Sequence, residues 1–388
     1  MRKFALLLAL LMLTLPAMAE EGEITLEDIF ENADPDVVAD TWIPAPQDSD
    51  DAMLVATDSI YEKDGSILIT ITGTGDFTVG GDTRKSSNIW YTELKKHDGD
   101  PNFALKNIRD VLLEDDLTIV NFEGTLTNST YIPASKKENQ FLFSAPPEYV
   151  SMLTDNGIEA VSLENNHVLD HGQEVWDETK SHLDNAGVVW SGDGQLGVIE
   201  IKGIQIAMLS YLTIDRYEQL WDKVPADIQA AKELYPIVIV SFHWGNEKDY
   251  SPTNNQIKMG RLAVDSGADL VLGHHSHRIN PIEYYNGVYI CYSLGNFCFA
   301  GNSKPSDMSS YLFQTRFRIR EGENGQEITN EGFRIIPIRI SSRTDRNDFI
   351  PTVHTKESSI DAIMTTLHES GEDLAYVVDE YPTEWPAN

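Results

Sequence analysis

The sequence contains few of the residues that mark a disulfide-stabilised protein or a thiolate metal site. Only two of its 388 residues are cysteine, Cys291 and Cys298. One pair cannot form a disulfide framework, and the apolar neighbours of both residues favour packed thiols over a disulfide. No CxxC pattern occurs in the chain, which argues against a zinc site built from thiolates.

Basic residues are also scarce. The chain has 29 Lys and Arg against 62 Asp and Glu, so its formal net charge is -33. This balance excludes the basic surface that a nucleic-acid-binding protein needs, and also a polybasic membrane patch. Hydrophobic residues make up 41% of the chain. That share is too high for a disordered acidic protein, and the charge is therefore expected on the surface and tails of a folded body.

Long apolar runs are absent except at the start of the chain. Arg2 and Lys3 precede an apolar run over residues 4–15, and small residues at 17–19 resemble a cleavage site. This pattern predicts a signal peptide over residues 1–19. Because no later segment has about 18 consecutive apolar residues, we expect an exported protein, extracellular, cell-surface or periplasmic, with no membrane span after cleavage.

The composition divides the mature chain into three parts. Residues 20–64 form an acidic leader, in which positions 20–51 contain neither Lys nor Arg. We expect a solvated linker there, docked on the body at most at isolated points such as Trp42. Residues 65–340 form the folded body, and residues 341–388 form a C-terminal appendage with a short helix around 360–367.

Within the body, apolar β-branched runs alternate with amphipathic stretches. Buried strands are predicted at 67–71, 117–122, 159–163, 205–211, 237–242 and 269–272, and helices at 103–113, 147–153, 173–185 and 255–265. This alternation predicts an α/β body with much parallel pairing. After residue 285 only strands follow, at 288–292, 312–319 and 333–340, with a hairpin signal at 321–326. We expect these strands to form a second sheet packed on the first.

Polar side chains follow five of the predicted strands at their carboxyl ends. They are Asp76, Glu123, the group Asn165, Asn166 and His167, then His243, and finally His274, His275 and His277. In open α/β sheets ligands bind outside the carboxyl ends of the strands, so the five groups are expected to converge. Imidazole, carboxylate and amide ligands suit zinc, iron or manganese, and this set is large enough for two ions.

Six segments along the chain together resemble, in order, the motif series of the CapA family. That family is associated with poly-γ-glutamate capsule synthesis and belongs to the calcineurin-like metallophosphoesterase superfamily. The segments are 75–78 (GDFT), 121–124 (NFEG), 165–172 (NNHVLDHG), 243–247 (HWGNE), 273–277 (GHHSH) and 292–297 (YSLGNF). The resemblance implies a four-layer α-β-β-α sandwich, in which two mixed sheets lie face to face with helices outside.

The resemblance also implies roles for individual residues. The implied ligands of the divalent metal ions are Asp76, Glu123, Asn166, His243, His275 and His277, with Glu123 bridging two ions. His167 would act as general acid or oxyanion stabiliser. The superfamily has Asp-x-His where this chain has Thr78 in the third position, so one of the two ions would be weakly held or absent.

The sequence leaves the roles of several residues open. Asp170 either orients His167 or caps the following helix. Arg278 either binds an anionic group of the substrate or forms a surface salt bridge. Asn296 lines the pocket or caps a turn. His171 and His274 are candidates for hydrogen bonding to metal-bound imidazoles, and no Gly-x-Ser-x-Gly motif surrounds Ser293 to support a nucleophile.

Two functional hypotheses follow from these observations. The first is an exported metal-dependent hydrolase that acts on an anionic envelope polymer such as poly-γ-glutamate, or on a phosphorylated substrate. The second is a non-catalytic accessory protein with a structural metal site, which binds polymer or assembly partners. Membrane proteins of capsule synthesis are further expected partners, and a nucleic acid is not.

Overall fold

The computed structural model describes residues 60–323 and 325–386, which belong to one unit, Ser59–Asn388. The predicted signal peptide and residues 20–59 of the acidic leader lie outside the described residues. Within the described part of the chain, no helix is long and apolar enough to cross a membrane.

The first sheet follows the order β16-β15-β14-β1-β2-β5-β6, and β13 also pairs with β1. Strands β1, β2, β5, β6 and β13 run parallel, whereas β14, β15 and β16 run antiparallel to their neighbours. The bounds are β1 Ile67–Thr78, β2 Leu117–Phe122, β5 Ala160–Ser162, β6 Val189–Ser191, β13 Asn296–Phe299, β14 Ser309–Gly322, β15 Gly325–Arg339 and β16 Thr352–Val353.

The second sheet follows the order β11-β12-β10-β9-β8-β7. Its middle strands β8, β9, β10 and β12 are parallel, and the edge strands β7 and β11 are antiparallel. The bounds are β7 Gly197–Ile201, β8 Ile204–Leu212, β9 Ile237–His243, β10 Leu270–His274, β11 Ile282–Tyr285 and β12 Val288–Cys291. A short parallel pair, β3 Thr125–Leu126 and β4 Ser144–Ala145, stands apart from both sheets.

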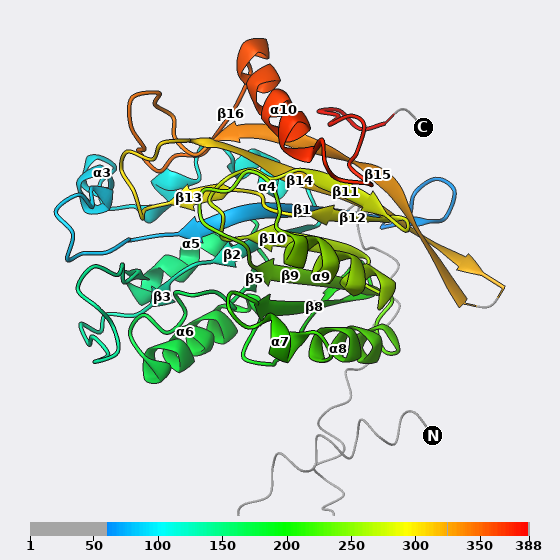
Figure 1. The fold of residues 1–388 in the computed structure, drawn as a ribbon, viewed down its shortest axis with the longest axis horizontal. Coiled ribbons are helices and arrows are strands. Elements are labelled where there is room, and N and C mark those ends of the chain that lie inside the picture. Colours follow the sequence, from blue (N-terminus) through cyan, green and yellow to red (C-terminus); the bar gives the residue numbers. More distant parts are fainter. Residues whose placement is uncertain (1–59, 324, 387–388) are drawn as a thin grey trace, which may run out of the picture. The chain divides into compact units, whose positions relative to one another are not determined.

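Alternating side chains of the central strands build three apolar cores. On β2, Leu117 and Ile119 join a core that also contains Ile237 and Ile239 of β9, so the two sheets pack on each other. Alternate residues of the same strands face the helices: Val120 lies in one outer core, and Val238 and Val240 lie in the other. The protein is therefore a mixed α/β sandwich (Figure 1).

The helices divide between these outer cores. Apolar residues of α3, α4, α5 and α6 lie in the core of the first sheet, and those of α8 and α9 lie against the second. The helical bounds are α3 Trp90–Lys96, η1 Pro101–Ala104, α4 Arg109–Leu113, η2 Pro147–Val150, α5 Ser151–Thr154, α6 Gln173–Ala186, α7 Tyr217–Leu220, α8 Lys223–Lys232, α9 Asn254–Asp265 and α10 Glu357–Gly371.

Most predicted elements are present, and two predictions are wrong. The helix expected over 103–113 is broken into η1 and α4, because Phe103, Leu105 and Ile108 are all buried in one core, which a regular helix of this sequence would not achieve. The strands after residue 285 do not form a sheet of their own. Instead β11 and β12 complete the second sheet, while β14 and β15 return to pair beside β1.

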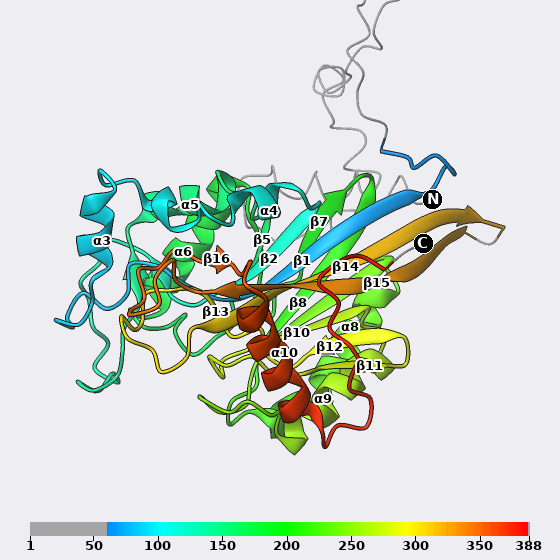
Figure 2. The ribbon, with the colours of Figure 1, turned by 90° about the horizontal axis from the view of Figure 1, so that it is seen from above.

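The C-terminal segment packs on the body. Strand β16 pairs with β15, Ile363 and Leu367 of α10 lie in the core between the sheets, and the backbone N–H of Ile335 donates to the carbonyl of Pro382. Figure 2 shows α10 running from beside β16 towards α9, and the long strands β14 and β15 extending beyond the rest of the body. Cys291 and Cys298 are both buried and are not joined.

Candidate metal centre

The parallel pairing brings the ends of separate strands to one edge of each sheet. In the first sheet Asp76 of β1 lies in register with Asn121 of β2, and Glu123 follows β2 directly. In the second sheet His243, the last residue of β9, lies in register with His274, the last residue of β10. The polar residues predicted at strand ends therefore meet where the two sheets face each other.

Asp76, Glu123 and His277 form the tightest group. One potential ligand atom from each of the three lies within 4.8 Å of the others. His277 Nδ1 is 3.0 Å from Asp76 Oδ2, and both carboxyl groups are fully buried. Two carboxylates and one imidazole make the mixed oxygen and nitrogen donor set that divalent transition metals accept.

The other predicted ligands lie next to this group. His243 Nε2 is 3.9 Å from Glu123 Oε1 and 2.6 Å from Asn166 Oδ1. The ring of His275 lies 4.6 Å from that of His243 and 6.2 Å from that of His277, measured between centroids. All six predicted ligands therefore belong to one connected cluster, although their role as ligands remains a prediction.

The surroundings of the two carboxyl groups in the cluster shift their pKa values in opposite directions. Burial acts to raise the pKa of Asp76, but the neighbouring His277 and His274 outweigh burial and lower it. Burial, followed by the charge of Asp76, raises the pKa of Glu123 to about 7. A bound cation would replace this mutual repulsion of the two carboxylates with attraction.

The surroundings of the imidazoles likewise shift their pKa values in opposite directions. Burial lowers the pKa of His275 and of His274 to about 4, and burial lowers the pKa of His243 well below its usual value. These rings are neutral at pH 7, as metal ligands must be. His277 differs, because the charges of Glu123 and Asp76 overcome burial and raise its pKa to about 9.

Several buried polar atoms of the cluster lack a hydrogen-bond partner. They include Glu123 Oε1 and His275 Nδ1. Asp76 Oδ2 is a third, because its neighbour His277 Nδ1 is hydrogen-bonded to Asn296 Oδ1 instead. A buried polar atom without a partner is costly, and two such oxygens in the tightest group, on Asp76 and Glu123, need an explanation. A divalent cation bound between Asp76 and Glu123 would satisfy both oxygens, so the residues present fit a metal centre.

The backbone at this site is held in unusual conformations. His275 has φ 92° and His277 has φ 53°, a region that residues with a side chain rarely adopt. Just before this turn, a Cβ on Gly273 would lie 2.2 Å from the carbonyl oxygen of Tyr292. Strain of this kind persists only when the surrounding structure imposes it, and it concentrates at functional sites.

His167 and Asp170 form a hydrogen-bonded pair beside the cluster. His167 Nδ1 lies 2.6 Å from Asp170 Oδ2, and its Nε2 lies 3.9 Å from Glu123 Oε1. The hypothesis that Asp170 caps the following helix is wrong, because the N-cap of α6 is Gly172 and no side chain caps that helix. Asp170 instead orients the imidazole, so that Nε2 faces the candidate metal ligands.

Arg278 and Asn296 adjoin His277. Asn296 Oδ1 is 2.9 Å from His277 Nδ1, which fixes the ring of a predicted ligand. Arg278 is 6% exposed and donates to the carbonyl of His277 and to Ser306 Oγ. The hypothesis that Arg278 forms a surface salt bridge is wrong, because its side chain is buried and forms no ion pair among the described residues.

Sequence reasoning missed three residues that support the site. The Asn121 amide donates to Asp76 Oδ1 at 2.8 Å and lies 3.2 Å from His243 Nδ1. Lys136 pairs with Asp170 at 2.5 Å, and the ring of Phe143 lies 4.3 Å from that of His167. Asn121 lies within a motif already quoted for Glu123, whereas nothing local marks Lys136 or Phe143.

Ser293 is buried and hydrogen-bonds to Ser276, as a structural residue does.

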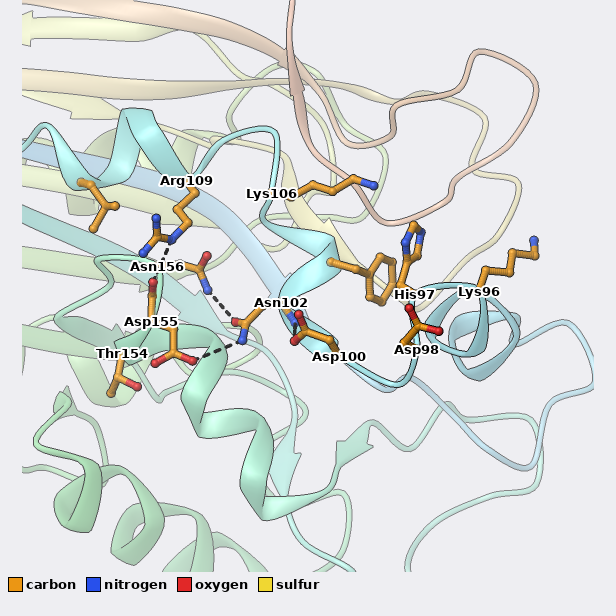
Figure 3. A pocket seen from close by; sticks show the side chains of 12 residues that line it. Lys96, His97, Asp98, Asp100, Asn102, Lys106, Arg109, Thr154, Asp155 and Asn156 are labelled. Carbon is orange, nitrogen blue, oxygen red and sulfur yellow. Dashed lines mark hydrogen bonds between the residues drawn. The ribbon is translucent and has the colours of Figure 1, made fainter.

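A separate cavity of about 830 Å³ lies among α3, η1, α4 and α5, and none of the predicted site residues lines it. Figure 3 shows Asn102 linked to Asn156 and Asp155 across this cavity. These hydrogen bonds connect η1 to the end of α5. We therefore assign the cavity no part in the candidate centre.

The fold and this site define a class: a mixed α/β sandwich with a buried carboxylate–imidazole cluster at strand ends that is suited to a divalent metal. The chain belongs to the family described as bacterial capsule synthesis protein PGA_cap, whose model matches residues 70–301. The matched segment contains every residue of the candidate centre, from Asp76 to Asn296.

Curated relatives agree with this assignment. The chain is 31% identical to the PGA biosynthesis protein CapA of Bacillus subtilis over 58% of its own length and 61% of that protein. It is 26% identical to the capsule biosynthesis protein CapA of Bacillus anthracis over 70% of its length and 67% of the relative. A probable polyglutamine synthesis accessory protein of Mycobacterium tuberculosis is 25% identical over 58% of this chain and 66% of its own length.

Proposed function

We propose that this protein is an exported, metal-dependent hydrolase of capsule synthesis that acts on an anionic envelope polymer such as poly-γ-glutamate. The observation that carries the proposal is the convergence of Asp76, Glu123 and His277 within 4.8 Å, with two of their buried oxygens unpartnered. In this proposal the sandwich is the four-layer arrangement of the metallophosphoesterases.

The cluster would hold one or two divalent ions, manganese, zinc or iron. Asp76, Glu123, Asn166, His243, His275 and His277 would be the ligands, with Glu123 between two ions. Such ions supply an activated water at neutral pH and polarise the oxygen of the bond to be cleaved. Asn121 would keep Asp76 and His243 in place through its amide group.

The remaining residues would handle the proton and the substrate. His167 would protonate the leaving group from Nε2, since its Nδ1 is held by Asp170. Arg278 would bind an anionic group of the substrate, because its buried charge has no carboxylate partner among the described residues. Asn296 would hold the ring of His277 in place.

The net charge of -33 does not exclude a polyanionic substrate. At physiological ionic strength the Debye length is about 8 Å, so repulsion from distant surface carboxylates is largely screened. Near the site, bound cations and Arg278 would reverse the local sign.

A second function, a non-catalytic accessory protein with a structural metal, is favoured by one observation. Thr78 stands where the superfamily motif has a histidine ligand, and its hydroxyl donates to Glu123 Oε2 at 3.3 Å. The relative from Mycobacterium tuberculosis bears the name of an accessory protein. In this alternative the protein would bind polymer or membrane-bound capsule-synthesis partners.

An activity screen separates the two functions. The purified protein, supplied in turn with manganese, zinc and iron, is assayed on bis(p-nitrophenyl) phosphate and on poly-γ-glutamate, before and after chelation. The hydrolase proposal predicts turnover of at least one of them, lost in chelator and in Asp76→Asn. Protein that binds metal yet cleaves neither compound would contradict the hydrolase and favour the accessory protein.

A further inference from the structure

The carboxyl group of Asp170 receives three donors, and two of them come from a distant segment. His167 Nδ1 lies 2.6 Å from Oδ2. The backbone N–H of Phe143 donates to the same oxygen at 2.7 Å, and Lys136 Nζ donates to Oδ1 at 2.5 Å. The carboxyl group is fully buried, so its orientation is decided by these three contacts.

Lys136 and Phe143 lie in residues 127–143, a segment between β3 and β4 that we call the 127–143 loop. Other contacts also hold this loop. The carbonyl of Tyr131 lies 2.8 Å from His171 Nδ1, and Arg84 donates to the carbonyl of Gln140 at 2.7 Å. Among the described residues of the loop, Lys136 is the one whose side chain hydrogen-bonds to the His167–Asp170 pair.

We infer that Lys136 is a positioning residue for His167. Its ammonium group fixes Oδ1 of Asp170, which leaves Oδ2 to accept from Nδ1 of His167 and turns Nε2 towards Glu123. The ring of Phe143 closes the other side of the imidazole at 4.3 Å. The inference rests on the proposed function, in which His167 transfers the proton.

Two features set this role apart from a direct contact with substrate. The Lys136 side chain is 16% exposed, and its ammonium group is bound to a carboxylate that is 0% exposed. A lysine that binds substrate anions needs a free ammonium group, whereas here the charge of Lys136 balances the buried charge of Asp170. Lys137, the next residue, is exposed and provides a matched control.

The test compares Lys136→Met, Lys136→Arg and Lys137→Met with the wild type, using manganese-loaded protein and bis(p-nitrophenyl) phosphate. Lys136→Met keeps the aliphatic stem and removes the charge. We expect its kcat to fall by about 10- to 100-fold, as misplacement of a catalytic group does, with KM within about 2-fold and metal content unchanged. Lys136→Arg should recover most of kcat, and Lys137→Met should match the wild type.

Other outcomes would overturn the inference. A raised KM with unchanged kcat would make Lys136 a substrate contact. A loss of metal in Lys136→Met would show that Lys136 only supports the structure. The same conclusion would follow if kcat fell equally in Lys136→Arg and Lys136→Met and both variants melted at a lower temperature.

A second readout does not depend on turnover. ¹⁵N NMR of labelled histidine should find the Nδ1–H tautomer of His167 in the wild type and a mixture of tautomers in Lys136→Met, with faster hydrogen exchange at the Phe143 amide. Unchanged tautomer and exchange would overturn the inference. If the wild type hydrolyses nothing but these spectra change as expected, the proposed function fails while the positioning role of Lys136 stands.

Discussion

Glu123 and His167 lie 3.9 Å apart, yet their surroundings assign them different tasks. Glu123 is fully buried, lies within reach of Asp76 and His277, and has one oxygen without a partner. His167 has one ring nitrogen occupied by Asp170 and the other directed towards the cluster. The first environment suits a ligand, and the second suits a proton donor.

Substitution of each residue should separate ligand from catalyst. Glu123→Gln removes an anion from the centre and should lower metal content. His167→Ala should keep metal bound while kcat falls by about 100-fold or more, the usual contribution of a general acid. Elemental analysis and steady-state kinetics measure the two effects, with Glu174→Gln, an exposed carboxylate on α6, as control. Equal loss of metal in both variants would place His167 among the ligands.

The sequence indicated the strand-end residues but not the residues that hold them. Asp76, Glu123 and His243 were predictable because parallel strands carry their carboxyl ends to one edge of a sheet. Lys136 and Phe143 were not, because they reach Asp170 through the path of an irregular loop. No periodicity or motif encodes such a path.

At the scale of elements, the approach of β1 to β13 places Asp76. The Asp76 backbone N–H donates to the carbonyl of Gly295 at 2.9 Å, just before β13 begins. A Cβ on Gly75 would lie 2.1 Å from that same carbonyl oxygen. Only glycine therefore allows the two segments to approach at this point.

Replacement of Gly75 tests this close approach. Gly75→Ala should separate β1 from the start of β13, lowering stability by about 2 kcal/mol or more and weakening metal binding. Gly187→Ala is the matched control, because its Cβ would meet nothing within 4 Å and only its φ of 73° is unfavourable; its cost should be about 1 kcal/mol. Chemical denaturation measures both, and equal losses would refute the steric argument.

A second element-scale prediction concerns Asp115, just before β2. Burial, followed by the charges of Glu159 and Asp116, raises its pKa to about 7, against its usual 3.8. Between about pH 4 and pH 7 the folded protein keeps a proton that the unfolded chain has released. The contribution of Asp115 to stability therefore falls as pH rises through this window.

Asp115→Asn removes this dependence. Its melting temperature should exceed that of the wild type by a few degrees at pH 8, and the difference should shrink towards zero as the pH falls to about 4. Asp110→Asn is the control, because Asp110 is exposed on α4 and its loss should not stabilise the protein more at pH 8 than at low pH. A difference for Asp115→Asn that is the same at pH 8 and at pH 4 would contradict the account.

The predicted elements that failed are those whose outcome depends on distant partners. The strand over 117–122 was predicted with its observed bounds because its apolar run is buried on both faces. The pairing of β14 with β1 joins segments more than 200 residues apart in the chain, and local pattern does not specify such a partner. The break between η1 and α4 likewise follows from burial against the first sheet.

At the scale of the whole molecule, the candidate centre connects the two sheets. Asp76 and Glu123 belong to strands of the first sheet or follow them, and His243 and His277 belong to the second sheet or follow it. Their contacts cross between the two. The metal site would exist only in the folded state. A metal bound there would therefore stabilise the packing of one sheet on the other.

The most direct test of the metal centre combines elemental analysis with thermal unfolding. The purified protein should contain at least one divalent transition metal ion per chain. A ligand present at 100 times its dissociation constant stabilises a fold by about 2.7 kcal/mol. Chelation should therefore lower the melting temperature by about 5 °C or more, and readdition of metal should restore it in the wild type but not in Asp76→Asn. Protein that contains no metal and melts at the same temperature with and without chelator would contradict the account.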